Sequence, residues 1–356
     1  MGKKLGFGCM RLPLVNPADR SSIDIGELSR MTDLFLERGF DYFDTATTYC
    51  DGHCEQAVRR ALVERYPRDR FRLAGKLPTM LVDNPLQQEE IFAGQLARCG
   101  TDYFDRYIIH CATEAFFDRA VQMQSFDFAF RKRDRGLVRE VGFSFHGSPE
   151  LLETILAEYP DVDFVQLQIN YADWDSATVA SHDCYRIALK RGKSIVAMCS
   201  LKGGVLASVP ARVEAMLRQL RPDYEPAAWA LRFIADLEGV DTVLSGMSSL
   251  GQMRHDTETL DRMPPLTERE REVLKTAARI IAEESPLQCT SCGYCTASCP
   301  AQIPIPDCLR SYNSGRHHAK ASECTACGRC ERTCPQRLGI IGAMRRMAAC
   351  AAAATP

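Results

Sequence analysis

A pair of cysteine runs near the C-terminus constrains this chain more than any other feature. Each run has the spacing C-x2-C-x2-C-x3-C-P. The cysteines are Cys289, Cys292, Cys295 and Cys299 in the first run, and Cys324, Cys327, Cys330 and Cys334 in the second. Three thiolates at this spacing bind three corners of an iron–sulfur cubane, and the fourth cysteine of each run binds the neighbouring cluster. We therefore expect Cys334 to complete the first ligand set and Cys299 to complete the second.

Structural zinc sites are the alternative for these cysteines, because C-x2-C pairs also suit tetrahedral zinc. Zinc needs only two such pairs, however, and it leaves the repeated Cys-Pro unexplained. The segment resembles a bacterial-type dicluster ferredoxin module. This resemblance implies two [4Fe-4S] clusters.

Composition sets limits on the partners of the chain. The 356 residues are 46% hydrophobic and 25% charged, with a formal net charge of -2, which is typical of globular proteins. This balance gives no reason to expect a nucleic acid or an anionic membrane as a partner. The sequence shows no apolar run long enough to span a membrane and no signal-peptide core near Met1. We therefore expect a cytoplasmic protein.

Before the cysteine runs, short apolar segments alternate with longer amphipathic ones. The apolar segments end near Met10, Phe43, Gly75, Ile109, Phe143, Leu167, Met198 and Leu244. Glycines at 39, 100 and 192 stand where helices need a C-terminal cap. Strands that alternate with helices favour a parallel sheet, and eight such units over about 250 residues predict a (β/α)8 TIM barrel, hence an α/β fold. An open doubly wound sheet is disfavoured, since no G-x-G-x-x-G follows the first strand.

The chain is predicted to contain three segments. The barrel is expected over 1–265 and a linker helix over 266–285, where LTEREREVLKTAARIIAEES is amphipathic. A ferredoxin-type domain with a C-terminal tail is expected over 286–356.

Four ionisable residues stand at or just after the ends of three consecutive expected strands. Asp44 ends the second strand, Tyr49 follows on its loop, Lys76 ends the third and His110 ends the fourth. Catalytic residues of such barrels lie at the carboxyl ends of the strands. A charged lysine beside a tyrosine favours the phenolate, and a carboxylate keeps the lysine charged. A tyrosine in this setting can protonate a carbonyl oxygen as hydride reaches the carbon.

Taken singly, these residues also have structural explanations. Asp44 suits a helix cap, Lys76 a solvated strand end and His110 a satisfied core histidine. Together with their surroundings, GFDYFDTATTYCDGHCEQAVRRAL, LAGK and DRYIIH, they resemble the aldo/keto reductase family over roughly residues 5–260. The resemblance implies that Tyr49 is the general acid, that Asp44 and Lys76 adjust its pKa, and that His110 orients the carbonyl group.

The same resemblance implies a nicotinamide dinucleotide site. It places Ser144 and Gln166 near the carboxamide, and Met198 where family members stack an aromatic ring. The loops after the seventh and eighth strands fit the phosphate position of barrels. They contribute the remaining candidates for cofactor binding: Gly203, Gly246, Ser248, Gln252 and Asp256.

An NADP preference is not favoured by these loops. Gly246 and Gln252 replace the basic residues of NADP-preferring family members, and a carboxylate at Asp256 would repel a 2′-phosphate. Either NAD is preferred, or a nicotinamide is not the physiological reductant.

These features together predict an oxidoreductase acting on a small carbonyl or alcohol substrate, with two clusters relaying electrons to or from the barrel site. A ferredoxin or flavodoxin is the expected electron partner. A flavin is a further candidate cofactor, because clusters move single electrons whereas nicotinamide carries hydride. One alternative is an NAD(P)H-dependent carbonyl reductase with structural or sensing clusters. The other is a non-catalytic electron-transfer or redox-sensing protein.

Overall fold

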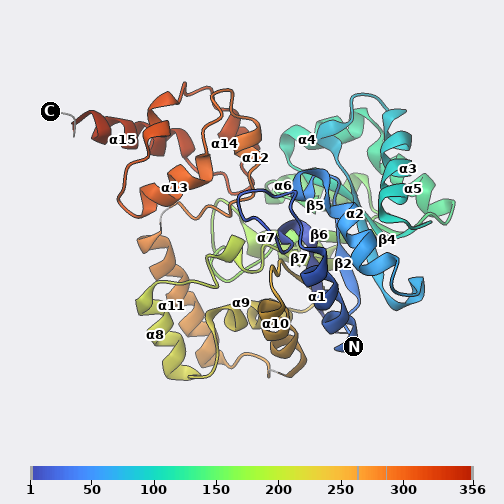
Figure 1. Cartoon of the computed structure of the whole chain (residues 1–356), viewed down its shortest axis with the longest axis horizontal. Coiled ribbons are helices and arrows are strands. Elements are labelled where there is room, and N and C mark those ends of the chain that lie inside the picture. The colour runs from blue at the N-terminus through green and yellow to red at the C-terminus, as the bar shows by residue number, and fades with distance from the viewer. Residues whose placement is uncertain (1–2, 263, 286, 354–356) are drawn as a thin grey trace. The chain divides into compact units, whose positions relative to one another are not determined.

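Eight parallel strands close into a barrel in chain order (Figure 1), which confirms the predicted (β/α)8 architecture. The computed structural model describes residues 3–262, 264–285 and 287–353. The strands are β1 (Leu5–Gly8), β2 (Tyr42–Asp44), β3 (Arg72–Leu77), β4 (Phe104–Ala112), β5 (Val138–Phe145), β6 (Phe164–Gln168), β7 (Ser194–Met198) and β8 (Val240–Ser245). Because β8 pairs with β1, the barrel has no open edge.

Helices follow the strands. They are α1 (Ile25–Glu37), α2 (Cys54–Val58), α3 (Gln87–Cys99), α4 (Glu114–Gln122), α5 (Ser125–Asp134), α6 (Pro149–Glu158), α7 (Ser181–Lys190), α8 (Ala211–Leu220), α9 (Pro226–Ala235) and α10 (Leu250–Arg262). The three predicted capping glycines, Gly39, Gly100 and Gly192, have φ of +77°, +67° and +66°. Glycine adopts this left-handed conformation without a Cβ penalty, so each ends its helix and turns the chain toward the next strand.

Local sequence also fixes where helices begin. The Asp24 carboxylate accepts from the Glu27 N–H at the start of α1, and the Ser148 hydroxyl accepts from the Leu151 N–H at the start of α6. Each cap satisfies a backbone donor that the first helical turn leaves free.

One of the amphipathic segments, EQAVRRALVERY, does not form a continuous α-helix. It starts within α2, but Arg59–Val63 forms a π-helical turn in which the Glu64 N–H donates to the Arg59 carbonyl at 2.9 Å. The buried residues Ala61 and Leu62 suit either kind of turn, so the apolar pattern cannot distinguish them.

The polar residues at the strand ends remain part of the sheet. Asp44 pairs with Gly8, Lys76 with Ile108, and Ser144 with Gln166. The strands therefore run beyond the apolar segments that predicted them. Sheet pairing holds these polar side chains more firmly than a loop would.

Below this polar layer, the interior of the barrel is filled with side chains. One buried layer comprises Tyr42, Ala74, Ile108, Phe164, Val196 and Leu244. Beneath it, the buried Arg106 guanidinium pairs with Glu140 at 2.6 Å and Asp241 at 2.5 Å. The barrel is thus a packed core, and open chemistry is confined to the carboxyl ends of its strands.

The chain divides into two compact units. The first contains the residues up to Ile169, Ala180–Ser200 and Ala228–Leu266. The second contains Asn170–Val179, Leu201–Ala227 and the residues from Thr267 onward. Two loops that follow β6 and β7 therefore group with the C-terminal part of the chain. The expected segment limits at residues 1, 286 and 356 lie outside the described residues.

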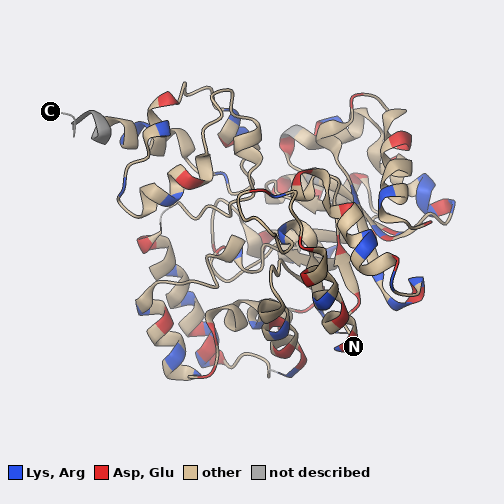
Figure 2. Ribbon diagram, viewed as in Figure 1, with Lys and Arg blue, Asp and Glu red and all other residues tan. Residues whose placement is uncertain are grey.

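The second unit continues with α11 (Glu268–Glu284), α12 (Tyr294–Ala297), α13 (Ile305–Asn313), α14 (Arg329–Thr333) and α15 (Ile340–Ala353). A capping box between Thr267 and Glu270 starts α11. This helix packs on α8, and both helices carry intermixed acidic and basic residues (Figure 2). Ile340, Met344 and Met347 bury one face of α15 in the core of this unit. None of the helices in the described ranges has the length and hydropathy of a membrane span.

Candidate functional site

The structure brings Asp44, Tyr49, Lys76 and His110 together at the carboxyl ends of β2 to β4. The Lys76 ammonium donates to the Asp44 carboxylate and, at 3.0 Å, to the Thr45 carbonyl. It also lies 4.8 Å from the centroid of the Tyr49 ring. The Tyr49 and His110 rings meet edge-on, with centroids 6.1 Å apart. Tyr49 is 7% exposed, and the other three side chains are more deeply buried.

Burial sets the electrostatics of this quartet. It raises the pKa of Asp44, against the opposing effects of the Lys76 charge and of hydrogen bonds from Lys76 and Tyr49. It lowers the pKa of His110 well below the ordinary value, and the positive charges of Lys76 and His146 act in the same direction. His110 is therefore neutral at neutral pH, and no described residue offers a hydrogen bond to its Nδ1 atom.

Irregular backbone directs two of these side chains. The pairing of β4 with β5 shifts register between Ile109 and Ala112, so the sheet is irregular around His110. Directly after Tyr49, Cys50 and Asp51 have φ of +49° and +52°. Consecutive non-glycine residues in this region are strained, and such strain persists only where the surroundings enforce it. The buried Cys50 thiol donates to the Cys9 carbonyl at 3.8 Å, which helps to hold the turn in place.

A buried polar network supports the quartet from behind, and sequence reasoning missed it. Gln95 on α3 donates to the Lys76 carbonyl at 2.7 Å and to the Thr47 hydroxyl at 2.8 Å. The buried Glu55 carboxylate accepts from Thr47 at 3.0 Å and from Arg98 at 2.6 Å. Both residues occur in amphipathic segments, where polar residues are usually solvated. Only their burial reveals this role.

The next strands provide the candidate nicotinamide side of the site. Ser144 on β5 and Gln166 on β6 are buried neighbours, and within the described ranges the Gln166 Oε1 atom has no hydrogen-bond partner. A buried acceptor without a partner fits the N–H groups of a carboxamide. Met198, at the end of β7, is half-buried and packs on the apolar barrel layer. These residues therefore suit the nicotinamide of the dinucleotide that the resemblance implied.

Sequence reasoning also missed a pair beside these residues. His146 Nδ1 and Gln168 Nε2 lie 2.6 Å apart, just beyond the end of β5 and at the end of β6. The strand-end criterion that selected His110 would have found both residues.

The candidates after β8 occupy two different environments. Gly246, Ser248 and Gln252 are exposed, and the Ser248 N–H donates to Gln252 Oε1 at 2.7 Å. Asp256 instead points inward from α10. Its carboxylate accepts from the Ser245 hydroxyl at 2.7 Å and lies 2.8 Å from His255 Nδ1. Both Asp256 oxygens therefore have partners within the protein.

Gly203, the candidate after β7, belongs to the second unit rather than to the barrel unit. Its φ is +69°. The atoms nearest to a Cβ added at this glycine belong to the backbone of Thr290.

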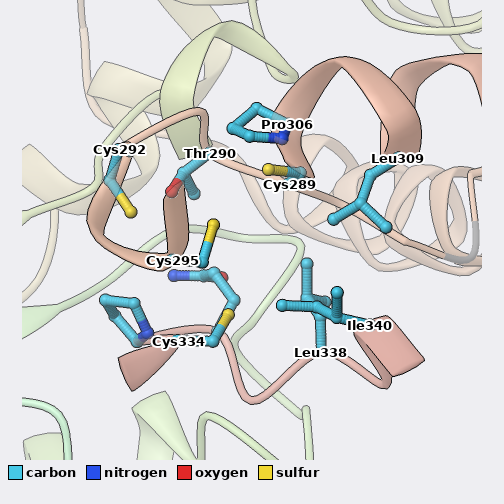
Figure 3. A pocket seen from close by; sticks show the side chains of 12 residues that line it. Cys289, Thr290, Cys292, Cys295, Pro306, Leu309, Cys334, Leu338 and Ile340 are labelled. Carbon is cyan, nitrogen blue, oxygen red and sulfur yellow. The ribbon is translucent and has the colours of Figure 1, made fainter. Parts of the chain in front are cut away.

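Two hollows in the second unit gather the eight cysteines of the runs. The first is lined by Cys289, Cys292, Cys295 and Cys334. Figure 3 shows these side chains around one shared space, with apolar residues such as Leu309, Leu338 and Ile340 beside them. The second hollow is lined by Cys299, Cys324, Cys327 and Cys330. Each hollow thus takes three cysteines from one run and the fourth from the other.

The two runs have left-handed backbone at the same two positions. Ser291 and Ala326, each just before the second cysteine of its run, have φ of +53° and +56°. Gly293 and Gly328 follow with +84° and +77°. Such turns direct successive N–H groups toward one point, which suits an anionic group.

The four thiols of each hollow suit an iron–sulfur cluster. A cubane takes four thiolate ligands, and each hollow gathers four cysteines beside apolar side chains. In the part of the chain that the structure describes, no three His, Cys, Asp or Glu side chains are grouped closely enough to hold a single metal ion.

Comparison with known proteins agrees with both parts of this description. Residues 4–277 match the Aldo/keto reductase family, and residues 288–339 match the 4Fe-4S dicluster domain. No curated protein matches the chain.

Among solved structures, the aldo-keto reductase AKR11C1 from Bacillus halodurans in its holo form is 25% identical, with a TM-score of 0.61. The match covers 77% of this chain and 91% of that chain. An aldo-keto reductase from Klebsiella pneumoniae in complex with NADPH is 18% identical, with a TM-score of 0.59. This match covers 78% of this chain and 90% of that chain, and it shows the fold alone. Since the family match spans most of the sequence, this chain, with its C-terminal 4Fe-4S dicluster domain, belongs to the aldo/keto reductase family of oxidoreductases.

Proposed function

We propose that the barrel site interconverts a small carbonyl compound and its alcohol, with Tyr49 as the general acid. The observation that carries this proposal is the buried Lys76–Asp44 pair lying against the Tyr49 ring, beside a neutral His110. A buried ion pair is costly to maintain and weak support for stability by itself. Its position beside a phenol suits proton transfer better than it suits a purely structural role.

Each residue has a definite part in this reaction. The Tyr49 hydroxyl donates its proton to the carbonyl oxygen, and the Lys76 charge stabilises the phenolate that remains. Asp44 holds Lys76 charged and in place. The neutral His110 ring orients the carbonyl through a hydrogen bond. Burial excludes water, which strengthens each of these interactions.

A nicotinamide dinucleotide is the hydride carrier that the site suits best. Ser144 and Gln166 would hold its carboxamide, and the Klebsiella pneumoniae relative binds NADPH. Once bound, the nicotinamide supplies or accepts the hydride. Nothing in the described residues or in the two solved structures named above favours a flavin.

The two hollows would hold [4Fe-4S] clusters, each with four cysteine ligands. Such clusters store and pass single electrons. In this proposal two electrons from a one-electron carrier protein, such as a ferredoxin or flavodoxin, would pass through the clusters one at a time. Together with one proton they would reduce the dinucleotide held in the barrel, and oxidation would run in reverse.

The test of the barrel chemistry is NAD(P)H-dependent reduction of an aldehyde and ketone panel under anaerobic conditions. Tyr49→Phe should lower kcat/KM by a factor of about 10² to 10⁴, because it removes the proton donor. Tyr103→Phe is the matched control, since that hydroxyl lies at the surface and accepts from Arg139. Equal activity in the wild type and Tyr49→Phe would reject the proposed acid.

The cluster part of the proposal has a separate test. Chemically reduced clusters in the wild type should be reoxidised by NAD⁺ or NADP⁺. If Cys289→Ala leaves the turnover of folded protein unchanged, the clusters are structural or sensing, and the chain is a conventional carbonyl reductase.

A further inference from the structure

The loop after β7 makes a contact that the proposed reaction does not use. A Cβ added at Gly203 would lie 2.5 Å from both the Cα and the carbonyl oxygen of Thr290, and real Cβ atoms essentially never approach within 3.0 Å. Thr290 stands between the first two cysteines of the first run, Cys289 and Cys292. The backbone of the first cysteine loop therefore rests directly on Gly203.

The shape of the β7 loop is fixed from within. Lys202 is buried and forms an ion pair with Asp173, in the loop after β6. The Asn170 amide donates to the same carboxylate at 2.8 Å. The Gly204 N–H donates to the Leu201 carbonyl at 2.9 Å, which closes the turn around Gly203. Because the Lys202 ammonium is committed to Asp173, its main effect here is to hold the loop in one conformation.

The first cysteine loop is also held just before its first ligand. The Asn313 side chain on α13 accepts from the Leu287 N–H at 3.3 Å and donates to the Leu287 carbonyl at 2.7 Å. Thr290 itself is 6% exposed, whereas Thr325, at the equivalent position of the second run, is exposed. The first cysteine site is thus supported by both Asn313 and Gly203.

From these contacts we propose that Gly203 is a positioning residue for the first cluster site, formed by Cys289, Cys292, Cys295 and Cys334. The first site, and not the second, is then coupled to the loop that follows β7. This inference rests on the proposed function, because it requires that the hollows hold clusters. It assigns Gly203 to the seat of the first cluster, in place of the dinucleotide contact expected from sequence.

The test compares Gly203→Ala with Gly204→Ala in anaerobically reconstituted protein. Gly204 also has a positive φ, of +104°, but a Cβ there would have no neighbour within 4 Å. The control therefore carries the backbone strain without the close approach to Thr290. The readouts are the EPR spectrum of the reduced protein and its content of iron and sulfide. Cys292→Ser and Cys327→Ser assign the signals to the first and second sites.

In Gly203→Ala, the signal of the first site should shift or disappear, and up to about half of the iron should be lost. The signal of the second site should be retained, and Gly204→Ala should keep both. An unchanged first-site signal in Gly203→Ala would overturn the inference. An equal loss of the first-site signal in Gly204→Ala would also overturn it, because backbone strain alone would then explain the effect.

A second variant keeps the test decisive if Gly203→Ala does not fold. Asp173→Asn frees Lys202 without adding volume, and it should perturb the first-site signal in preference to the second. A uniform effect on both signals, or none, would argue against the coupling. If the wild type itself binds no clusters, the proposed function fails instead, so the two failures are distinguishable.

Discussion

His110 illustrates how burial of one side chain makes stability depend on pH. Burial lowers its pKa first, and the charges of Lys76 and His146 lower it further. In the unfolded chain its pKa is near the ordinary value of about 6.5. As pH falls below that value, the His110 imidazole binds a proton in the unfolded state but stays neutral in the folded state. His110 therefore contributes stability that is complete above the unfolded pKa and is lost progressively below it.

We accordingly expect the wild type to lose more stability than His110→Gln between pH 7 and about pH 5, by up to about 1 kcal/mol per pH unit. Anaerobic urea denaturation, followed by circular dichroism at several pH values, measures the two slopes. Other titrating groups, and the acid lability of any cluster, affect both proteins and cancel in the comparison. Parallel slopes would show that His110 already titrates normally in the folded state.

At this scale, much of the candidate site could be predicted from the sequence. Asp44, Lys76 and His110 follow apolar segments directly, so their places at the ends of strands follow from strand period and topology. Glu55 and Gln95 could not be predicted in the same way. A polar residue on an amphipathic helix has the same pattern whether it faces water or a buried network, and only tertiary packing separates the two cases.

Among the elements, α10 bears on the choice of dinucleotide. At its start, the Leu250 N–H donates to the Glu27 carboxylate of α1 at 2.8 Å. This hydrogen bond, followed by those from Arg30, lowers the pKa of Glu27 and keeps it ionised. A helix N-terminus favours an anion, and here a carboxylate already occupies it. A 2′-phosphate bound at this end would therefore meet an existing negative charge.

On this basis NADH should bind more tightly than NADPH, and Glu27→Gln should reduce the difference by several-fold, where a tenfold change corresponds to about 1.4 kcal/mol. Kd values from calorimetric titration at two salt concentrations measure this effect, because a charge effect weakens with added salt. Glu37→Gln, at the other end of α1, removes an equal charge from an exposed position and serves as the control. If both variants gained the same affinity for NADPH relative to NADH, the effect would come from net charge rather than from the Glu27 contact.

Helices and strands could be predicted where the apolar residues keep one spacing throughout the segment. Apolar spacing and a terminal glycine were enough for α1, α3 and α7. The π-helical turn at Arg59–Val63 could not be found, because it changes the hydrogen-bonding step without disturbing the apolar positions.

Across the whole molecule, the grouping of segments was the feature least accessible to sequence. A change in pattern predicts a boundary at residue 265, but nothing in the pattern predicts that Leu201–Ala227 groups with the second unit. That membership rests on contacts such as Gly203 with Thr290, between residues far apart in the chain. A glycine pair in a loop has many explanations, and only the fold identifies its neighbour.

The crossed arrangement of the cysteines is the property of the whole second unit that is most open to experiment. Because Cys334 lines the hollow of the first run, Cys334→Ser should alter the same EPR signal as Cys292→Ser. By the same reasoning, Cys299→Ser should alter the signal that Cys327→Ser alters. Each single variant should lose up to about four of eight irons, since one cubane of two loses a ligand. If Cys334→Ser affected the Cys327 signal instead, each run would hold its own cluster. Stoichiometric zinc without an EPR signal would reject clusters altogether.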